Sequence, residues 1–270
     1  MKAINDRGMV VIGCGFMGKA LLEGWLASGV KPEAIHVQDP APSDWLKAQT
    51  GFHLNKDLPA NPAVLVIATK PQVLADVLPP LAHFGDGDTI VVTIATGAPL
   101  AYYEASFGAK TPVARAMPNL PAAVGAGVTV FACNANVSDA QAELVADLFN
   151  AVGTGIALAD EEQMHAVTGI SGSGPAYVFA MAEAMTKAGE AMGLSRDLAS
   201  TLAVHTIAGA GAMMRDADTE AGDLRRAVTS KGGTTAEALK HLMAPGTGLF
   251  DLMEKASGAS RDRSIELSTP

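Results

Sequence analysis

Three glycines near the start of the chain, Gly13, Gly15 and Gly18, have the spacing of a phosphate-binding turn. They follow an apolar run over 10–12, typical of a buried parallel strand, and precede a helical stretch over 19–28. The first glycine permits a tight turn, the second lets the backbone approach a pyrophosphate, and the third lets helix and strand pack closely. Free N–H groups at the helix start then face the phosphates. The pattern predicts dinucleotide binding, and a purely structural turn is the alternative.

Two glycines and two threonines in the C-terminal half form a second segment with chemical potential. Thr234 and Glu237 have the spacing of a capping box. We therefore expect Gly232 and Gly233 to turn the chain into a helix N-terminus there. Exposed N–H groups, with the hydroxyls of Thr234 and Thr235, would form a small anion site suited to a carboxylate. A capped helix without a ligand is the alternative.

A carboxylate, Asp39, follows the second expected strand, 35–37. About 20 residues beyond the glycine turn, such a group can accept hydrogen bonds from both ribose hydroxyls and repels a 2′-phosphate. No arginine or lysine stands between Pro32 and Trp45 to compensate. Asp39 therefore predicts a preference for NADH over NADPH. The alternative is that its side chain points to solvent in a turn with Pro40.

The first half of the chain alternates short strands with helices. Strands are expected over 35–37, 63–68, 89–94, 113–116 and 128–132, and helices over 71–82, 99–106 and 138–150. Repeated strand–helix units imply a parallel sheet wound on both faces, which binds ligands beyond the carboxyl ends of its strands. Three loops fall at those ends, 69–71, 95–97 and 117–119, and we expect them to share one edge of the sheet.

From about Asp160 a helical period replaces the strands. One apolar stripe, predicted to be core or subunit interface, consists of Tyr177, Met181, Met185, Ala188 and Met192. The next expected helix, 196–215, contains Gly209 and Gly211, whose low helix propensity suggests close approach of another helix. The sequence thus predicts an N-terminal Rossmann-type doubly wound α/β domain (1–160) and an all-α C-terminal dimerisation domain (161–270), with helices interlocked between subunits.

Composition narrows the class of protein. Of the 270 residues 49% are apolar and the net charge is −9, so there is no basic footprint for nucleic acid. Cys14 and Cys133 cannot form a disulfide framework, and neither they nor the histidines have metal-ligand spacing. No run approaches the length of a membrane span, and the first ten residues do not form a signal peptide. We expect a cytoplasmic protein without a metal.

These segments together resemble the pyrroline-5-carboxylate reductases, in order and over nearly the whole chain. The matching runs are 12–18, 68–71, 95–97, 115–119, 166–178 and 228–235. The glycine fingerprint occurs in many families, whereas the last two runs at this separation are specific. The resemblance implies NAD(P)H-dependent reduction of the cyclic imine 1-pyrroline-5-carboxylate to L-proline. It also implies a helix-swapped homodimer, often in larger rings of dimers, with the active site between the nicotinamide and helical elements of the dimer.

The same resemblance assigns the site residues. Those implied for the coenzyme are Gly13, Cys14, Gly15, Phe16, Met17, Gly18, Ala68, Thr69, Lys70, Pro71, Ala95, Thr96 and Gly97. The backbone of Gly232, Gly233 and Thr234 would hold the substrate carboxylate, and Thr235 would hydrogen-bond the ring nitrogen. A hydroxyl is a poor acid near neutral pH, so Thr235 is expected to orient the ring nitrogen or relay a proton through water rather than act as a general acid.

The chain departs from the family pattern at three positions. Lys231 stands where proline is usual, which removes a rigid turn but adds a cation near the proposed carboxylate site. Asp218 lies where an acid often faces the substrate ring nitrogen, although its acidic surroundings also fit a solvated surface. Asp39 replaces a small hydroxyl residue that accepts the 2′-phosphate of NADPH.

Two other classes of protein share parts of this pattern. A β-hydroxyacid dehydrogenase would need a catalytic lysine one turn along the helix from its glycine-rich loop, but the first lysine after Ser171 is Lys187. A non-catalytic NAD(P)-sensing protein would need no carboxylate site.

Overall fold

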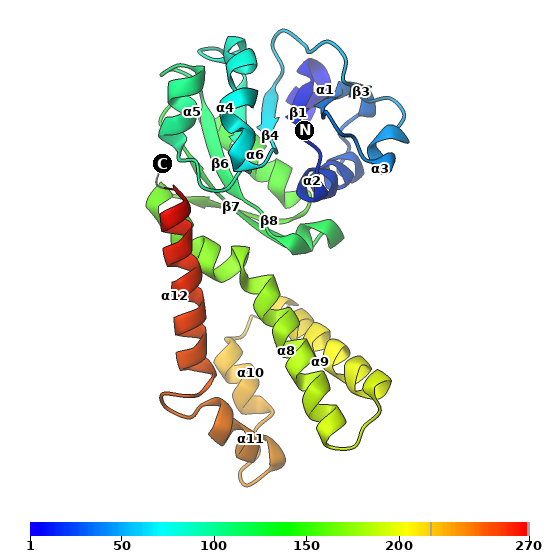
Figure 1. The fold of residues 1–270 in the computed structure, drawn as a ribbon, viewed down its shortest axis with the longest axis vertical. Helices are drawn as coiled ribbons and strands as arrows, with labels where there is room; N and C mark the ends of the chain where they lie inside the picture. Colours follow the sequence, from blue (N-terminus) through cyan, green and yellow to red (C-terminus); the bar gives the residue numbers. More distant parts are fainter. Residues whose placement is uncertain (217, 269–270) are drawn as a thin grey trace. The chain divides into compact units, whose positions relative to one another are not determined.

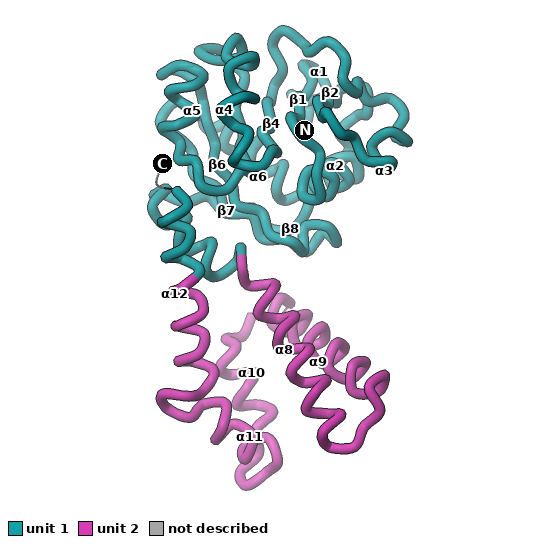
Figure 2. Tube along the Cα trace, viewed as in Figure 1, with its two compact units in different colours: residues 1–172, 260–270 teal, residues 173–259 magenta. Residues whose placement is uncertain are grey.

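The computed structural model describes residues 1–216 and 218–268 of the chain (Figure 1). Two compact units are distinguished, and each is described by itself (Figure 2). Unit 1 comprises Met1–Gly172 and the C-terminal residues from Ser260, and unit 2 comprises Ser173–Ala259. The functional domain limits expected at residues 160 and 161 stay a prediction.

Unit 1 is built on one eight-stranded sheet with the order β3-β2-β1-β4-β5-β6-β7-β8. The strands are β1 (Met9–Ile12), β2 (Ile35–Gln38), β3 (His53–Leu54), β4 (Val64–Ile67), β5 (Ile90–Thr93), β6 (Val113–Met117), β7 (Gly127–Cys133) and β8 (Gly153–Leu158). From β1 the chain runs outward to β2 and β3, then returns to β4 on the other side of β1. This reversal creates a crevice at the carboxyl ends of β1 and β4, where such sheets bind ligands.

The expected all-parallel sheet is wrong at one pairing, because β7 runs antiparallel to β6. Only a short 3-10 turn, η4 (Leu120–Val124), separates the two strands, and a parallel connection needs a much longer crossover. Helix α6 (Asp139–Asn150) then provides such a crossover to β8, which pairs parallel to β7. The glycine-rich strand β8 has little apolar alternation and was not predicted.

Helices cover both faces of the sheet, which confirms the doubly wound class. One core cluster includes Leu22 and Trp25 of α2 (Phe16–Ala27) and Leu148 of α6. The other includes Leu74 of α4 (Leu74–Val77) and Tyr103 of α5 (Leu100–Phe107). The remaining elements of this unit are α1 (Lys2–Arg7), η1 (Pro32–Ala34), α3 (Asp44–Lys47), η2 (Pro71–Val73), η3 (Pro79–Phe84), η5 (Glu161–Gln163), α7 (Met164–Val167) and the π-helical turn η6 (Thr168–Gly172).

The helical stretch expected near 71–82 is present, but it is not one continuous helix. The segment forms η2, the single turn α4 and η3 in succession. Pro71 and Pro79 stand at the starts of the two 3-10 turns, since proline has no N–H for a helix interior.

Unit 2 is helical, as predicted, and no helix in the described residues is long and apolar enough to cross a membrane. It contains α8 (Gly174–Ala191), α9 (Arg196–Asp216), α10 (Ala221–Ala227), α11 (Thr234–Leu242) and the first part of α12 (Leu249–Ser268), whose end belongs to unit 1. Helices α8 and α9 approach closely at Gly189, where a Cβ would lie 2.8 Å from Ala199 Cβ.

Within one chain, no other helix of the described residues approaches the two glycines of α9, contrary to expectation. No described atom of another element lies within 4 Å of a Cβ placed at Gly209 or Gly211. The predicted apolar stripe of α8 is also largely uncovered, with Met192 77% exposed and Met181 42% exposed. The core interpretation of the stripe therefore fails inside the chain, which leaves the subunit-interface interpretation.

Candidate functional site

The glycine turn after β1 has the geometry that its sequence predicted. Gly13 has φ +85°, and a Cβ there would lie 3.0 Å from the carbonyl oxygen of Ala68. At Gly18 a Cβ would lie 3.1 Å from the Gly13 carbonyl oxygen, so this glycine lets α2 pack close to the strand. Gly15 is the N-cap of α2, and a Cβ there would meet no described atom within 4 Å. The space beside the N-terminus of α2 is thus open to an anion.

A pocket of about 330 Å³ lies beyond the carboxyl ends of β1, β4, β5 and β6. Its lining residues are Gly15, Phe16, Met17, Gly18, Ala68, Thr69, Lys70, Pro71, Ile94, Ala95, Thr96, Met117 and Pro118. The three loops expected at this edge are therefore brought together. Four predicted coenzyme residues do not line it: Gly13 and Cys14 lie in the glycine turn, Asp39 follows β2, and Gly97 faces the carbonyl oxygen of Leu267.

One polar atom of this pocket fits a bound dinucleotide. The hydroxyl oxygen of Thr69 is buried and has no hydrogen-bond partner among the described residues. A buried hydroxyl without a partner is costly, and a phosphate or ribose oxygen would satisfy it. Together with the open N-terminus of α2, Thr69 gives the pocket the donors that an NAD(P) coenzyme requires.

Asp39 is held at the glycine turn. Its Oδ2 accepts a hydrogen bond from the backbone N–H of Cys14 (2.7 Å), and its Oδ1 accepts one from Ala41 N–H (2.8 Å). Each oxygen keeps a further lone pair for a ribose hydroxyl. The carboxylate also contributes, after burial, to raising the pKa of the Cys14 thiol to about 11. Cys14 is therefore a protonated packing residue near neutral pH.

Sequence reasoning missed Asn55, which clamps the backbone of Asp39. Asn55 Oδ1 accepts from Asp39 N–H and Asn55 Nδ2 donates to the Asp39 carbonyl, both at 2.9 Å. Asn55 has φ +50°, a left-handed conformation that asparagine tolerates. The fold also brings Lys56 to this strand end, where its carbonyl accepts from Gln38 Nε2 (2.6 Å). A cation close to Asp39 can therefore also come from outside the range Pro32 to Trp45.

In unit 2, the predicted anion segment does lead into a helix, but the capping box is wrong. The N-cap of α11 is Gly233, and Thr234 is its first helical residue. No side chain caps this end, because the Glu237 carboxylate instead accepts from Lys240 Nζ (2.7 Å). Gly232, at φ +71°, makes the turn, and Gly233 N–H donates to the Ser230 carbonyl.

The other predicted substrate residues differ in exposure. Thr235 is half-buried, whereas Thr234 and Lys231 are exposed. Asp218 is exposed in the turn between α9 and α10. Its pairing with a substrate stays a prediction.

Known protein families match both the N-terminal and the C-terminal part of the chain. The family model for pyrroline-5-carboxylate reductase dimerisation matches residues 161–267, and the model for NADP oxidoreductase, coenzyme F420-dependent, matches residues 9–97. The pyrroline-5-carboxylate reductase of Pseudomonas aeruginosa is 41% identical over 95% of each chain. That of Mycobacterium tuberculosis is 39% identical over 96% of each. The chain belongs to the pyrroline-5-carboxylate reductase family.

Solved structures of pyrroline-5-carboxylate reductases agree with this assignment. The enzyme from Coxiella burnetii has a TM-score of 0.92 at 33% identity, covering 98% of this chain and 100% of that one. The Plasmodium falciparum pyrroline carboxylate reductase, solved with NADP bound, has a TM-score of 0.84 at 27% identity, covering 98% and 99%. The predicted resemblance, fold class and assignment to the NAD(P)-dependent oxidoreductases are thereby confirmed.

In this member of the pyrroline-5-carboxylate reductase family, a buried polar network lies under the loop 95–97 and was not predicted. The Thr93 hydroxyl accepts from Ala95 N–H (3.2 Å) and bonds the Tyr103 hydroxyl (2.7 Å). Arg115, only 4% exposed, pairs with Glu161 (2.6 Å), which also accepts from the first N–H of α5. The bond from Ala95 N–H to the Thr93 hydroxyl fixes the first residue of the loop.

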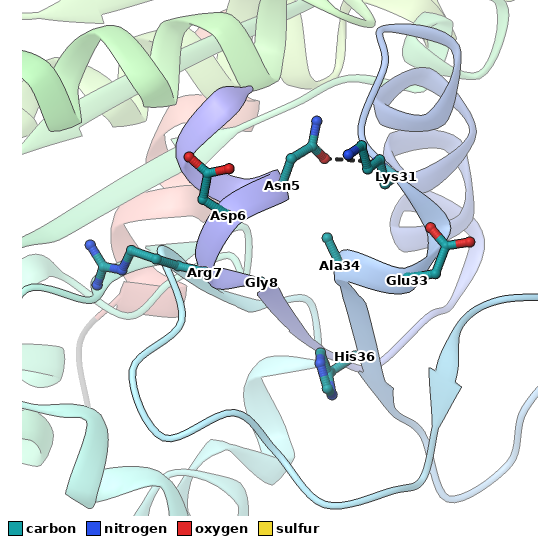
Figure 3. Close-up of a pocket in the computed structure, with 8 residues that line it drawn as sticks. All are labelled: Asn5, Asp6, Arg7, Gly8, Lys31, Glu33, Ala34 and His36. Carbon is teal, nitrogen blue, oxygen red and sulfur yellow. Dashed lines mark hydrogen bonds between the residues drawn. The ribbon is translucent and has the colours of Figure 1, made fainter.

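A second hollow, of about 260 Å³, lies at the opposite edge of the sheet (Figure 3). Gly8 and Ala34, which line it, immediately precede β1 and β2, and the bond between Lys31 N–H and Asn5 Oδ1 (2.8 Å) closes one side. None of the predicted site residues is in it. Ligands of doubly wound sheets bind at the carboxyl edge, so the 330 Å³ pocket is the candidate site.

Proposed function

We propose that this chain reduces the C=N bond of 1-pyrroline-5-carboxylate to give L-proline, the last step of proline biosynthesis, with NAD(P)H as the reductant. The observation that carries the proposal is the pocket at the carboxyl edge of the sheet, with the open N-terminus of α2 at Gly15, in a chain of the pyrroline-5-carboxylate reductase family. The β-hydroxyacid dehydrogenase alternative lacks its lysine, and family membership favours turnover over sensing.

The coenzyme would supply a hydride to the imine carbon. Residues of the glycine turn, Gly15 to Gly18, and the N-terminus of α2 would hold the pyrophosphate, while the Thr69 hydroxyl would donate to it or to a ribose. Loops 68–71 and 95–97 would line the nucleotide. The protein's main contribution is to align two rings, because an iminium already accepts hydride readily.

The substrate carboxylate would bind at the start of α11. No side chain caps this helix, so its first backbone N–H groups and its positive dipole end are available to an anion. Gly232, Gly233 and Thr234 provide that backbone, with the Lys231 cation next to it in the sequence. Thr235 would hydrogen-bond the ring nitrogen and Asp218 would face the same atom.

We further propose that NADH is preferred to NADPH. Support comes from the position of Asp39, whose carboxylate is fixed at the glycine turn by Cys14 and Ala41 N–H groups. Asn55 holds its backbone, so the charge cannot swing away from the ribose position without breaking these bonds.

The chain would act as a homodimer, and a ring of dimers would add a second, different contact between the dimers. The dimerisation model over 161–267 supports an oligomer, and the exposed methionines of α8 offer an apolar surface for a second copy. A monomer in light scattering at micromolar concentration would contradict this. The cytoplasmic location stays a prediction.

The test is direct. Purified chain is mixed with 1-pyrroline-5-carboxylate and either NADH or NADPH, and loss of the reduced nicotinamide absorbance is followed together with proline formation. We expect stoichiometric oxidation of coenzyme and formation of L-proline. Coenzyme binding without turnover would favour a sensor, and oxidation of β-hydroxyacids with NAD⁺ would favour the dehydrogenase.

A further inference from the structure

The order of the strands along the pocket indicates at which end the nicotinamide ring of a bound coenzyme would lie. Asp39 lies after β2, on one side of β1, and is the group expected to meet the adenosine ribose. The pocket extends the other way, past β4 and β5 to Met117 and Pro118 at the end of β6. A dinucleotide spanning the crevice therefore has its nicotinamide at the Met117 end. This step rests on the proposed function.

The next residue, Asn119, does not line the pocket but is 8% exposed and bonded at both ends of its amide. Its Nδ2 donates to the carbonyl of Ser171 (3.1 Å), and its Oδ1 accepts from Val128 N–H (2.9 Å). If the Asn119 amide were flipped, its Oδ1 would face the Ser171 carbonyl and its Nδ2 would face Val128 N–H, and both bonds would be lost. The two partners therefore fix one orientation of the amide. Asn119 thereby joins segments far apart in the sequence, and none of the coenzyme loops provides either partner.

Ser171 belongs to the π-helical turn η6 (Thr168–Gly172). Such turns are rare and concentrate at functional sites. At the end of this turn, a Cβ built on Gly172, which glycine itself lacks, would lie 3.9 Å from Cγ and Sδ of Met117, so the backbone of the turn passes close to that side chain. The turn therefore sits behind the Met117 side chain, and Met117 itself is part of the pocket wall.

We infer that Asn119 is a positioning residue for the reaction: by holding the turn Thr168–Gly172 against Met117, it fixes the wall at the nicotinamide end of the pocket. The Asn119 amide bonds the Ser171 carbonyl, the turn at the neighbouring Gly172 passes close to the Met117 side chain, and Met117 lines the pocket. Asn119 touches neither coenzyme nor substrate in this arrangement, so its effect is on ring placement rather than on chemistry.

The chain offers a closely matched control in Asn134. Its Oδ1 accepts from Val113 N–H (3.1 Å) and its Nδ2 donates to the Thr111 carbonyl (2.9 Å), the same kind of bonds at the opposite end of the same strand, β6. Asn134 Nδ2 also donates to the Glu104 carboxylate (2.8 Å). Asn134→Asp therefore disrupts at least as much structure as Asn119→Asp, without reaching the pocket.

The experiment compares Asn119→Asp and Asn134→Asp with the wild-type chain. Asn119→Asp keeps the acceptor for Val128 N–H but turns a carboxylate oxygen toward the Ser171 carbonyl, so the turn is released. Binding of NADH is measured by nicotinamide fluorescence. Binding of ADP-ribose, which lacks the nicotinamide, is measured by calorimetry. Melting temperature, kcat and the isotope effect with NADH deuterated at the transferred position complete the set.

For Asn119→Asp we expect NADH affinity to fall roughly three- to tenfold, as when part of a buried methionine contact is lost, with ADP-ribose affinity unchanged. We expect kcat to fall about 10- to 100-fold with a larger isotope effect, because a displaced ring slows hydride transfer itself. For Asn134→Asp we expect an equal or larger drop in melting temperature, with both affinities and kcat unchanged.

An unchanged ratio of NADH to ADP-ribose affinity in Asn119→Asp would overturn the inference, as would equal losses in Asn134→Asp. If Asn119→Asp does not fold, Met117→Ala decides: a lower NADH to ADP-ribose ratio supports the contact route, and wild-type behaviour refutes it. If the wild-type chain binds NADH but reduces no imine, the proposed reaction fails while the binding ratio still tests Asn119.

Discussion

The sharpest prediction concerns the charge of Asp39. Asp39→Asn keeps the size of the side chain and removes its negative charge, although only one of the two N–H donors, Cys14 or Ala41, then finds an acceptor. A 2′-phosphate in place of the ribose hydroxyl would lie about 4 Å from this carboxylate, where each unit charge costs about 1 kcal/mol at the dielectric constant of water and about 4 kcal/mol at an effective value of about 20.

The expected change in coenzyme preference follows from these figures. Each 1.4 kcal/mol corresponds to about a tenfold change, so for one unit of phosphate charge the kcat/KM ratio of NADPH to NADH rises roughly five- to several-hundred-fold in Asp39→Asn. The gain shrinks as salt is added, because the site opens to solvent. Initial rates with both coenzymes, at low and high ionic strength, provide the measurement.

The control is Asp44→Asn. Asp44 is an exposed acid in the first turn of α3, paired with Lys47 (3.6 Å), and it does not line the pocket. Removing its charge should leave the coenzyme ratio unchanged. If wild-type chain prefers NADPH tenfold, or if Asp39→Asn and Asp44→Asn change the ratio equally, the electrostatic reasoning is wrong.

Three further predictions follow from single side chains. Thr235→Ala should lower kcat/KM for the imine by roughly ten- to a thousand-fold, the loss of one or a few transition-state hydrogen bonds, and unchanged steady-state kinetics would remove Thr235 from the mechanism. Gly97→Ala should lower the free energy of unfolding by about 1–2 kcal/mol because Gly97 has φ +96°, and further because the new Cβ would meet the Leu267 carbonyl. Gly29 has a similar φ of +91° but open space around it, so in urea unfolding Gly29→Ala should lose less stability than Gly97→Ala. Burial, with the charge of the stacked His53, lowers the pKa of His36, so the unfolded chain binds the proton more readily and stability is lost as pH falls below about 6.5; His36→Gln should show a shallower dependence of the unfolding free energy on pH in urea titrations.

Local patterns predicted the geometry of the glycine turn and the gathering of the loops beside it. The roles of Gly13, Gly15 and Gly18 depend on neighbours within one strand–turn–helix unit, so their spacing was sufficient. The gathering of the loops 68–71 and 95–97 followed from a rule of topology, since carboxyl ends of parallel strands share an edge.

Polar contacts between residues far apart in the chain could not be predicted from the sequence. Asn55 and Asp39 meet because β3 pairs with β2, and Asn119 meets Ser171 across 52 positions. Nothing in the local pattern distinguishes these asparagines from ordinary turn residues. The capping box failed for a local reason instead: the helix begins at Thr234 after the N-cap Gly233, and Glu237 pairs with Lys240 one turn along the same helix.

The bond between Cys14 N–H and Asp39 has a consequence for redesign. It joins the carboxylate proposed to discriminate between ribose and ribose phosphate to the turn proposed to hold the pyrophosphate, and the donor is a main-chain amide that only proline at position 14 would delete. We therefore expect selectivity and total affinity for the coenzyme to change together. A library that swaps the acid at position 39 will trade binding strength for choice of coenzyme, and recovering that strength will require compensating changes in the turn itself.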